Sequence, residues 1–274
     1  MSLDKFYTDP TYARKCIHKV YELYGDQWDL VVEPSAGNGS FLNQIQSDKK
    51  VGMDIEPDDA NIVQGDFFMY APPKSARDVL VIGNPPFGRM CSTAIKFFNH
   101  ASKWAHVVAF IVPRTFRRVS VQNRLNLSFR LVYDEEIPTS PCFFSPPMMV
   151  KCCFQIWERH AHVRETVRLS VCHDDWTFLP HGPVDMKGQP TPPSGADFAI
   201  RAYGGKIGEI RTEGLETLRP KSWHWIKSNI DKDVLMSRFV RLDYSVGLDT
   251  ARQNSIGRGE LVSLYVKLIH PVCQ

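Results

Sequence analysis

The stretch with the clearest chemical potential is residues 83–88, Gly-Asn-Pro-Pro-Phe-Gly, which directly follow the apolar run at residues 79–82. Two consecutive prolines fix the backbone and cannot donate hydrogen bonds, so the loop is a rigid set of carbonyl acceptors. A planar amino group could donate its two hydrogens to the Asn84 side chain and the Pro85 carbonyl, with Phe87 stacked on the ring that bears it. Asparagine does not titrate, so this chemistry would be positioning and polarisation of an amine.

A second candidate site is the glycine-rich turn at residues 33–39, Glu-Pro-Ser-Ala-Gly-Asn-Gly. It lies between an apolar run at residues 29–33 and a predicted helix at residues 40–46. Strand, turn and helix form the first crossover of a doubly wound fold, in which ligands bind at the carboxyl ends of the strands. The turn is neither Gly-x-Gly-x-x-Gly nor a phosphate loop. Taken alone, it indicates a ligand site and a plain structural turn equally well.

Two acids follow at positions that suit a nucleoside. Asp54 ends the second predicted strand, at residues 50–55. An acid roughly 20 residues after the turn is typical of hydrogen bonding to ribose hydroxyls. Asp66 and Phe67 could hold an adenine ring by its edge and its face. The alternative is an exposed strand-end acid, a turn residue and a core phenylalanine.

The elements that must position these residues alternate along the chain. Predicted helices at residues 11–24, 40–46 and 92–104 separate predicted strands at residues 29–33, 50–55, 79–82 and 107–112, with a weak helix start at residues 57–59. Because these strands are continuous apolar runs, they indicate a parallel sheet covered on both faces. Two more strands are predicted at residues 130–137 and 150–157. We therefore predict an α/β fold with a doubly wound, mostly parallel, Rossmann-like sheet.

The residue composition changes in the C-terminal part of the chain, and we expect a smaller α+β extension there. Residues 173–197 are rich in Pro, Gly and Asp and predict a loop or linker. Short strands are expected at residues 197–227 and helices at residues 231–242 and 258–268. Three tryptophans, Trp176, Trp223 and Trp225, indicate either a buried aromatic cluster or a surface that stacks nucleobases. The predicted domains are residues 1–160 and 161–274.

Composition excludes several classes of protein. The chain has 274 residues with 43% hydrophobic and 23% charged residues, which excludes disorder, collagen and coiled coil as whole-chain answers. The net charge of +3 excludes nucleic-acid binding by bulk charge. Locally, residues 114–130 contain five arginines and no acid. This window predicts either contacts to phosphates or a solvated helical face, and the arginines are Arg114, Arg117, Arg118, Arg124 and Arg130.

The cysteines and the N-terminus bear on compartment. None of the seven cysteines is in a Cys-x-x-Cys pair, and a zinc site from Cys142, Cys152, Cys172 and His173 lacks ligand spacing, so we predict no metal. The first ten residues are polar, and no apolar run reaches the ~18–20 residues of a spanning helix. We therefore expect an intracellular protein, cytoplasmic or nuclear, without a signal peptide or a membrane partner.

The motifs together resemble those of methyltransferases that use S-adenosyl-L-methionine to modify amines, and most of all the gamma-type adenine-N6 methyltransferases of nucleic acids. In that family the cofactor turn is Glu/Asp-Pro-x-x-Gly-x-Gly, which residues 33–39 fit, and residues 84–87 match Asn-Pro-Pro-Phe. A Phe/Tyr-Thr-Pro segment precedes the first helix in the family, and residues 5–10, Lys-Phe-Tyr-Thr-Asp-Pro, match it apart from the inserted Asp9. The order of the three motifs is the gamma order, and the resemblance covers about residues 4–158.

This resemblance implies a set of site residues. The cofactor S-adenosyl-L-methionine would be bound by Tyr7, Thr8, Glu33, Pro34, Ala36, Gly37, Gly39, Asp54, Ile55, Asp66, Phe67 and Asn84. The target amine would be held by the catalytic residues Asn84, Pro85, Pro86 and Phe87. A flipped base would face Phe87 and either Phe143 or Phe144, and its phosphates would meet Arg114, Arg117 and Arg118. No metal is implied.

Three functions are compatible with these motifs. The first is an adenine-N6 methyltransferase acting on DNA or RNA, with residues 161–274 recognising the nucleic acid. The second is a protein glutamine methyltransferase, whose motif usually has Tyr where this chain has Phe87. The third is a non-catalytic methyltransferase-like binding module. The intact motifs argue against the third, and the C-terminal extension and the arginine window favour the first over the second.

Overall fold

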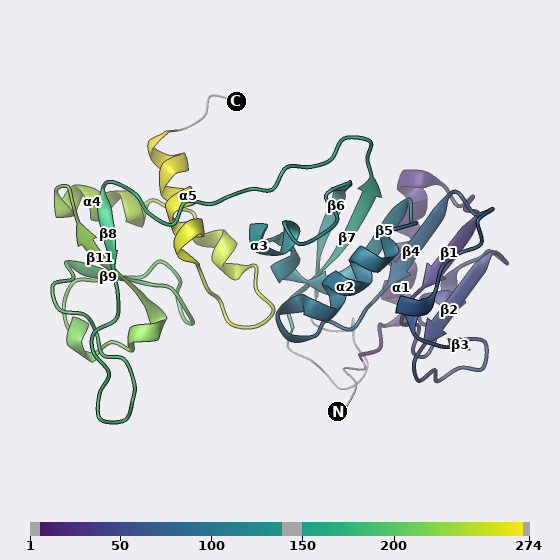
Figure 1. Ribbon diagram of the computed structural model, residues 1–274, viewed down its shortest axis with the longest axis horizontal. Helices are drawn as coiled ribbons and strands as arrows, with labels where there is room; N and C mark the ends of the chain where they lie inside the picture. The colour runs from purple at the N-terminus through teal and green to yellow at the C-terminus, as the bar shows by residue number, and fades with distance from the viewer. Residues whose placement is uncertain (1–5, 139–149, 271–274) are drawn as a thin grey trace. The chain divides into compact units, whose positions relative to one another are not determined.

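The computed structural model describes residues 6–138 and 150–270. The chain divides into two compact units, Met1–Val167 and Arg168–Gln274, each with its own sheet (Figure 1). Phe143, Phe144 and Cys142 lie outside the described residues. Within the described ranges, no helix is long and apolar enough to cross a membrane.

The first unit is built on a seven-stranded sheet with the order β3-β2-β1-β4-β5-β7-β6. Neighbouring strands from β3 to β5 pair parallel, and β7 pairs antiparallel with both β5 and β6. The doubly wound, mostly parallel Rossmann-like class predicted from the sequence is therefore confirmed. The strands are β1 (Leu30–Glu33), β2 (Lys50–Asp54), β3 (Val63–Gln64), β4 (Val79–Gly83), β5 (Val107–Pro113), β6 (Phe129–Ile137) and β7 (Cys152–Arg159).

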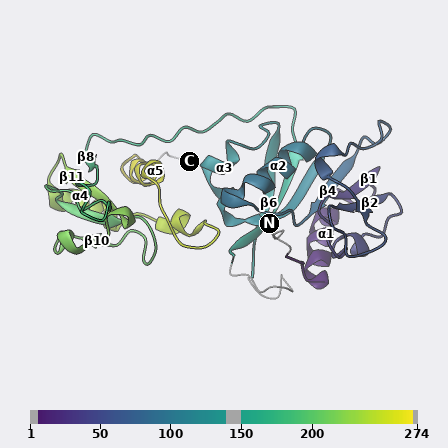
Figure 2. The ribbon, with the colours of Figure 1, turned by 60° about the horizontal axis from the view of Figure 1, so that its bottom comes forward.

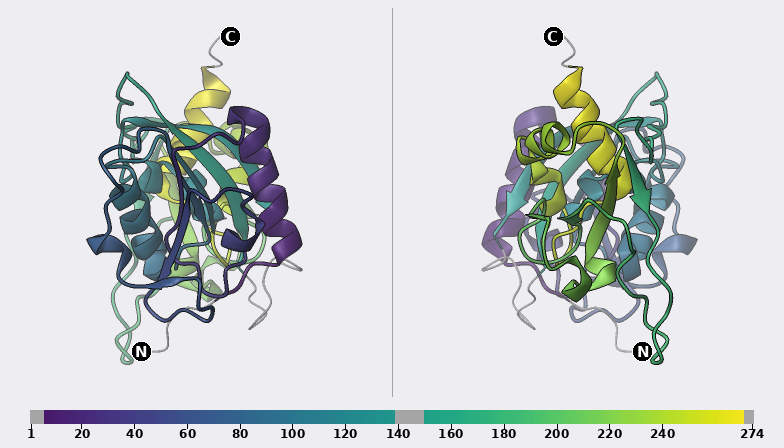
Figure 3. Two further views of the ribbon diagram at one scale, coloured as in Figure 1. Left: turned by 90° about the vertical axis from the view of Figure 1, so that its right-hand side faces the viewer. Right: turned by 90° about the vertical axis from the view of Figure 1, so that its left-hand side faces the viewer.

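Helices cover both faces of this sheet, and Figures 2 and 3 show α1 (Pro10–Tyr24) and α2 (Ser92–Ala101) on opposite sides of it. Asp9 caps α1, because its carboxylate accepts hydrogen bonds from the backbone of Thr11 and Tyr12. A 3₁₀ turn (Arg114–Arg117) and one short α-helical turn, α3 (Val119–Gln122), follow β5. Every residue of β4 and β5 is buried, which is why both strands read as uninterrupted apolar runs.

Two predicted helices are wrong. Residues 40–46 form only a 3₁₀ turn at Leu42–Gln44, because the Lys50 ammonium occupies the carbonyls of Leu42 and Ile45 at 3.0 and 2.6 Å. Those carbonyls would otherwise accept the hydrogen bonds of a continuing helix. The predicted start at residues 57–59 is a loop instead, since the Asp58 N–H donates to the Gly37 carbonyl, 2.9 Å away.

The second unit is a four-stranded antiparallel sheet with the order β10-β9-β11-β8, packed with two helices. Its helices, α4 (Lys232–Val240) and α5 (Arg258–Ile269), confirm the two predicted there. The strand β8 lies within the stretch predicted as loop, where Trp176 packs into the core against α4 and α5. The strands are β8 (Trp176–Leu179), β9 (Phe198–Arg201), β10 (Ile210–Arg211) and β11 (Trp223–Ser228).

The tryptophans of this unit are core residues. Trp176, Trp223 and Trp225 are 2%, 4% and 1% exposed. The buried aromatic cluster is therefore the correct interpretation of these residues, and their rings are not available to stack on nucleobases.

Candidate active site

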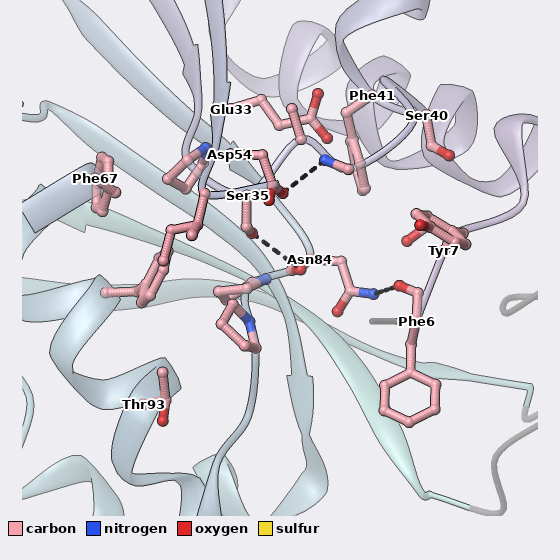
Figure 4. A pocket seen from close by; sticks show the side chains of 18 of the residues that line it. Phe6, Tyr7, Glu33, Ser35, Ser40, Phe41, Asp54, Phe67, Asn84 and Thr93 are labelled. Carbon is pink, nitrogen blue, oxygen red and sulfur yellow. Dashed lines mark hydrogen bonds between the residues drawn. The ribbon is translucent and has the colours of Figure 1, made fainter. Parts of the chain in front are cut away.

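A cavity of about 420 Å³ opens at the carboxyl ends of β1, β2 and β4 (Figure 4). Parallel strands that end together gather their loops at one edge of the sheet, which is where doubly wound folds bind ligands. The walls come from residues 6–8, from the glycine-rich turn, from the ends of β2 and β3, from the loop after β4 and from the first turns of α2.

Most of the residues predicted for the site line this cavity: Tyr7, Thr8, Glu33, Pro34, Ala36, Gly37, Asp54, Ile55, Asp66, Phe67, Asn84, Pro85, Pro86 and Phe87. The sheet edge thus brings together three motifs that are up to 80 residues apart in the chain. Gly39, Arg114, Arg117 and Arg118 do not line it.

Asn84 is held on two sides. Its side-chain Nδ2 donates to the backbone carbonyl of Phe6 at 3.1 Å, and its own backbone carbonyl accepts from the Ser35 hydroxyl at 3.2 Å. The side-chain Oδ1 is buried and has no hydrogen-bond partner within the described part of the chain. A buried acceptor left unpaired costs roughly 1–3 kcal/mol. The Asn84 oxygen is therefore an acceptor that a ligand bound in the cavity could satisfy.

The glycines of the turn serve its conformation. Gly37 and Gly39 have φ values of +52° and +78°, in the left-handed region that favours glycine. A Cβ on Gly37 would come within 2.9 Å of the Tyr7 ring, and one on Gly39 within 2.7 Å of the Asn43 amide. The space that these glycines leave is therefore filled by the side chains of Tyr7 and Asn43.

The carboxylate of Asp54 fastens the turn to the end of β2. Its Oδ2 accepts from the backbone N–H of Gly37 and its Oδ1 from that of Glu56, both at 2.9 Å. Each carboxylate oxygen keeps a further lone pair for a ligand hydroxyl. Ile55 follows immediately, with 54% of its surface exposed, and offers an apolar wall beside that carboxylate.

The two phenylalanines after Asp66 differ in their surroundings. Phe67 is 2% exposed and stacks on Phe97 with ring centres 5.3 Å apart, whereas Phe68 is 38% exposed. Both line the cavity, but Phe68 has more free ring surface for a ligand. Asp66 accepts from the Phe68 N–H at 2.9 Å and so fixes the local turn.

Two titratable groups of the site have raised pKa values. Glu33 is 2% exposed beneath the turn, where its Oε2 accepts from the Leu42 N–H at 2.7 Å. Burial raises the pKa of this carboxyl well above its ordinary value. The Tyr7 hydroxyl donates to the Asp58 carboxylate, and this bond, with burial and the nearby acids, raises the pKa of Tyr7 to about 12.

Sequence reasoning missed part of the lining: Phe6, Ser35, Asn38, Ser40, Phe41, Gly65, Phe68, Gly88, Thr93 and Phe97. Thr93 and Phe97 are four residues apart on α2 and therefore share one helix face. This spacing, next to the Asn-Pro-Pro-Phe loop, is the signal that would have identified them. Nothing in the local pattern distinguishes Phe68 from Phe67.

The arginine window follows β5 at the same sheet edge, but acids from β6 lie against it. Arg117 Nε is 2.9 Å from Asp134 Oδ1, and its Nη1 is 3.0 Å from Glu136. Arg114 Nη2 is also 3.0 Å from Glu136. These ion pairs raise the pKa of Arg117 further and compensate its charge. A phosphate contact by these two arginines and by the partly buried Arg118 beside them stays a prediction. The ion pairs leave Arg114 and Arg117 with less uncompensated charge than the sequence window suggests.

Residues 6–138 and 150–270 contain no group of three His, Cys, Asp or Glu side chains that could hold a metal ion.

Comparisons with known proteins add a fold-level likeness. No protein-family model and no curated protein matches the chain. Among solved structures, it is similar to a protein assigned as an RNA methyltransferase from Pyrococcus horikoshii, at 16% identity over 58% of this chain and 89% of that one, with a TM-score of 0.43. The 23S rRNA methyltransferase ErmE gives 17% identity, coverages of 58% and 71%, and a TM-score of 0.42.

A third similar structure is a modification subunit assigned to a type I restriction enzyme from Vibrio vulnificus. It gives 13% identity over 97% of this chain and 61% of that one, with a TM-score of 0.45. All three identities and scores are low, so the fold class rests on the strand order of the first unit.

Proposed function

We propose that this chain transfers a methyl group from S-adenosyl-L-methionine to the exocyclic N6 amine of adenine in DNA or RNA. The observation that supports this proposal most directly is the buried, unpaired Asn84 Oδ1 on the wall of the cavity. An amine bound there would donate one hydrogen to this oxygen. The Pro85 carbonyl, in the same rigid loop, is the second acceptor of the proposal.

The chain's own contribution would be to bind the amine, to orient it and to exclude water from it. Two hydrogen bonds from the amine would draw its lone pair out of the ring's conjugation and direct it toward an electrophile. Phe87 would stack on the ring. A base paired within a duplex cannot reach such a pocket, so the proposal requires a flipped or single-stranded adenine.

The residues present fit S-adenosyl-L-methionine. The Thr8 hydroxyl is a second buried polar group that lacks a hydrogen-bond partner among the described residues, and it lines the same cavity. We propose that Thr8 binds the amino-acid end of the cofactor, Asp54 the ribose hydroxyls, and Asp66, Ile55 and Phe68 the adenine. The cofactor supplies an electrophilic methyl group, whose transfer to an amine leaves a neutral thioether and releases one amine proton.

Aromatic walls favour a nucleobase over a glutamine side chain as the acceptor. Phe6 and Phe87 both line the cavity and are only partly buried, so both have ring surface to offer. Stacking on aromatic rings stabilises a bound base by about 1–3 kcal/mol per base. A glutamine amide has no ring and would leave this apolar surface unused. We further propose that residues 161–274 recognise the substrate.

The test is transfer of a labelled methyl group to separate pools of DNA, RNA and protein, followed by mass spectrometry of the nucleosides. The expected product is N6-methyladenosine or its deoxy form, and the polymer that contains it identifies the substrate. Label found on protein alone would contradict the proposal and support the glutamine methyltransferase.

A further inference from the structure

We propose that residues 6 and 7 form a latch that fixes the orientation of the Asn84 amide and ties it to the glycine-rich turn. The latch consists of the Phe6 carbonyl on Asn84 and the Tyr7 hydroxyl on Asp58. The inference rests on the proposed function for its kinetic consequence. The geometry on which it depends stands apart from any activity.

The amide of Asn84 has an orientation problem that its own loop does not solve. The oxygen and the nitrogen of a primary amide have nearly the same shape, so rotation by 180° exchanges an acceptor for a donor. A donor facing an incoming amine would repel it. The Phe6 carbonyl accepts from Nδ2 at 3.1 Å, which selects the orientation with Oδ1 unpaired (Figure 4). In this orientation the acceptor remains available to the amine.

The segment that supplies this carbonyl is anchored one residue further along. The Tyr7 hydroxyl donates to the Asp58 carboxylate, and the Tyr7 ring fills the space above Gly37. The raised pKa of Tyr7, about 12, keeps this hydroxyl protonated and able to donate over the whole working range of pH. The Asp58 backbone N–H in turn donates to the Gly37 carbonyl at 2.9 Å. The anchor therefore joins residue 7 to the turn at two points.

The glycine-rich turn also holds Asn84 from the other side. The Ser35 hydroxyl donates to the backbone carbonyl of Asn84 at 3.2 Å. The turn thus positions the backbone of Asn84 directly and its side chain through the latch. Both the cofactor wall and the amine acceptor are consequently parts of one hydrogen-bonded frame, and loosening the latch should disturb the amine acceptor first.

The decisive variant is Tyr7→Phe, which removes the hydroxyl and keeps the ring above Gly37. We expect kcat to fall about tenfold, the effect of one hydrogen bond. The KM values for cofactor and polymer should stay within about twofold. Asp58→Ala removes the same bond from the acceptor side and should give the same loss. Asp58→Asn keeps an oxygen acceptor and should restore kcat to within about twofold of the wild type.

A second readout is independent of activity. In protein labelled with ¹⁵N-asparagine, the side-chain amide protons of Asn84 should exchange slowly with solvent, because one of them is hydrogen-bonded to the Phe6 carbonyl. Tyr7→Phe should accelerate that exchange. The matched control is Tyr21→Phe, on α1 outside the cavity, which should change neither kcat nor the Asn84 signal.

The outcomes separate the two proposals. An inactive wild type with the expected exchange behaviour would contradict the proposed function and leave the latch supported. An active wild type in which Tyr7→Phe and Asp58→Ala retain full kcat and unchanged Asn84 exchange would overturn the latch. Equal losses in kcat for Tyr7→Phe, Asp58→Asn and Tyr21→Phe would indicate general destabilisation and would also overturn it.

Discussion

Replacing Asn84 by alanine removes the unpaired acceptor while leaving the rest of the cavity in place. Removal of a single positioned hydrogen-bonding group that acts in the transition state reduces kcat by about 10²–10³, or about 3–4 kcal/mol. The Pro85 carbonyl remains as an acceptor, so we expect residual transfer at roughly that reduced rate. Cofactor affinity should change by less than about threefold, because the proposed cofactor contacts lie on the other walls.

The same substitution should have little effect on stability, because two contributions oppose each other. Alanine loses the Nδ2–Phe6 hydrogen bond, a net loss of about 0.5–1.5 kcal/mol. It also removes a buried acceptor without a described partner, which relieves a penalty of about 1–3 kcal/mol. At the middle of both ranges the net change is about 1 kcal/mol, which corresponds to a shift of about 2–4 °C in the melting temperature of a unit of this size.

The assay combines single-turnover methyl transfer, calorimetric titration of the cofactor and thermal unfolding. The matched control is Asn61→Ala, an exposed asparagine that does not line the cavity, which should behave as the wild type in all three measurements. A fall in kcat of less than threefold would remove Asn84 from the proposed mechanism. A parallel loss of transfer and cofactor affinity would show that Asn84 acts on the cofactor side instead.

Three further predictions concern charge. Because the pKa of Glu33 is raised in the folded state, its contribution to the free energy of unfolding is fully present below about pH 4.5. This contribution is lost as the pH rises through the folded-state pKa. Urea unfolding without cofactor at pH 5 and pH 9 should show the loss in the wild type and not in Glu33→Gln. Burial lowers the pKa of His224 from 6.5 to about 4. Its contribution to the free energy of unfolding is therefore present above pH 6.5 and is lost as the pH falls, by about 3 kcal/mol in all. In His224→Asn the stability should fall less steeply at acid pH. Arg117→Ala should lower the melting temperature, because it leaves Asp134 without its ion pair. The predicted phosphate contact requires, in addition, a smaller salt slope of polymer binding, and an unchanged slope would limit Arg117 to the ion pair.

The sequence alone determined most strands of the sheet and the edge at which the candidate site lies. The uninterrupted apolar runs at residues 79–82 and 107–112 predict buried parallel strands, since a strand covered on both faces needs no polar residues. The chemistry-bearing residues come directly after such runs, and parallel strands end at one edge. The sequence therefore predicts that Asn84, Asp54 and the glycine-rich turn converge at that edge.

The tertiary structure decided which atoms meet. Lys50 ends the helix expected after the turn, and Asp134 and Glu136 of β6 compensate arginines that the sequence window presents without an acid. Phe68 rather than Phe67 has the freer ring surface, and the Phe6 carbonyl orients Asn84. Periodicity along a chain reports burial, one segment at a time. The pairing of a carbonyl at residue 6 with an amide at residue 84 depends on how distant segments are brought together by the fold, and no local pattern encodes it.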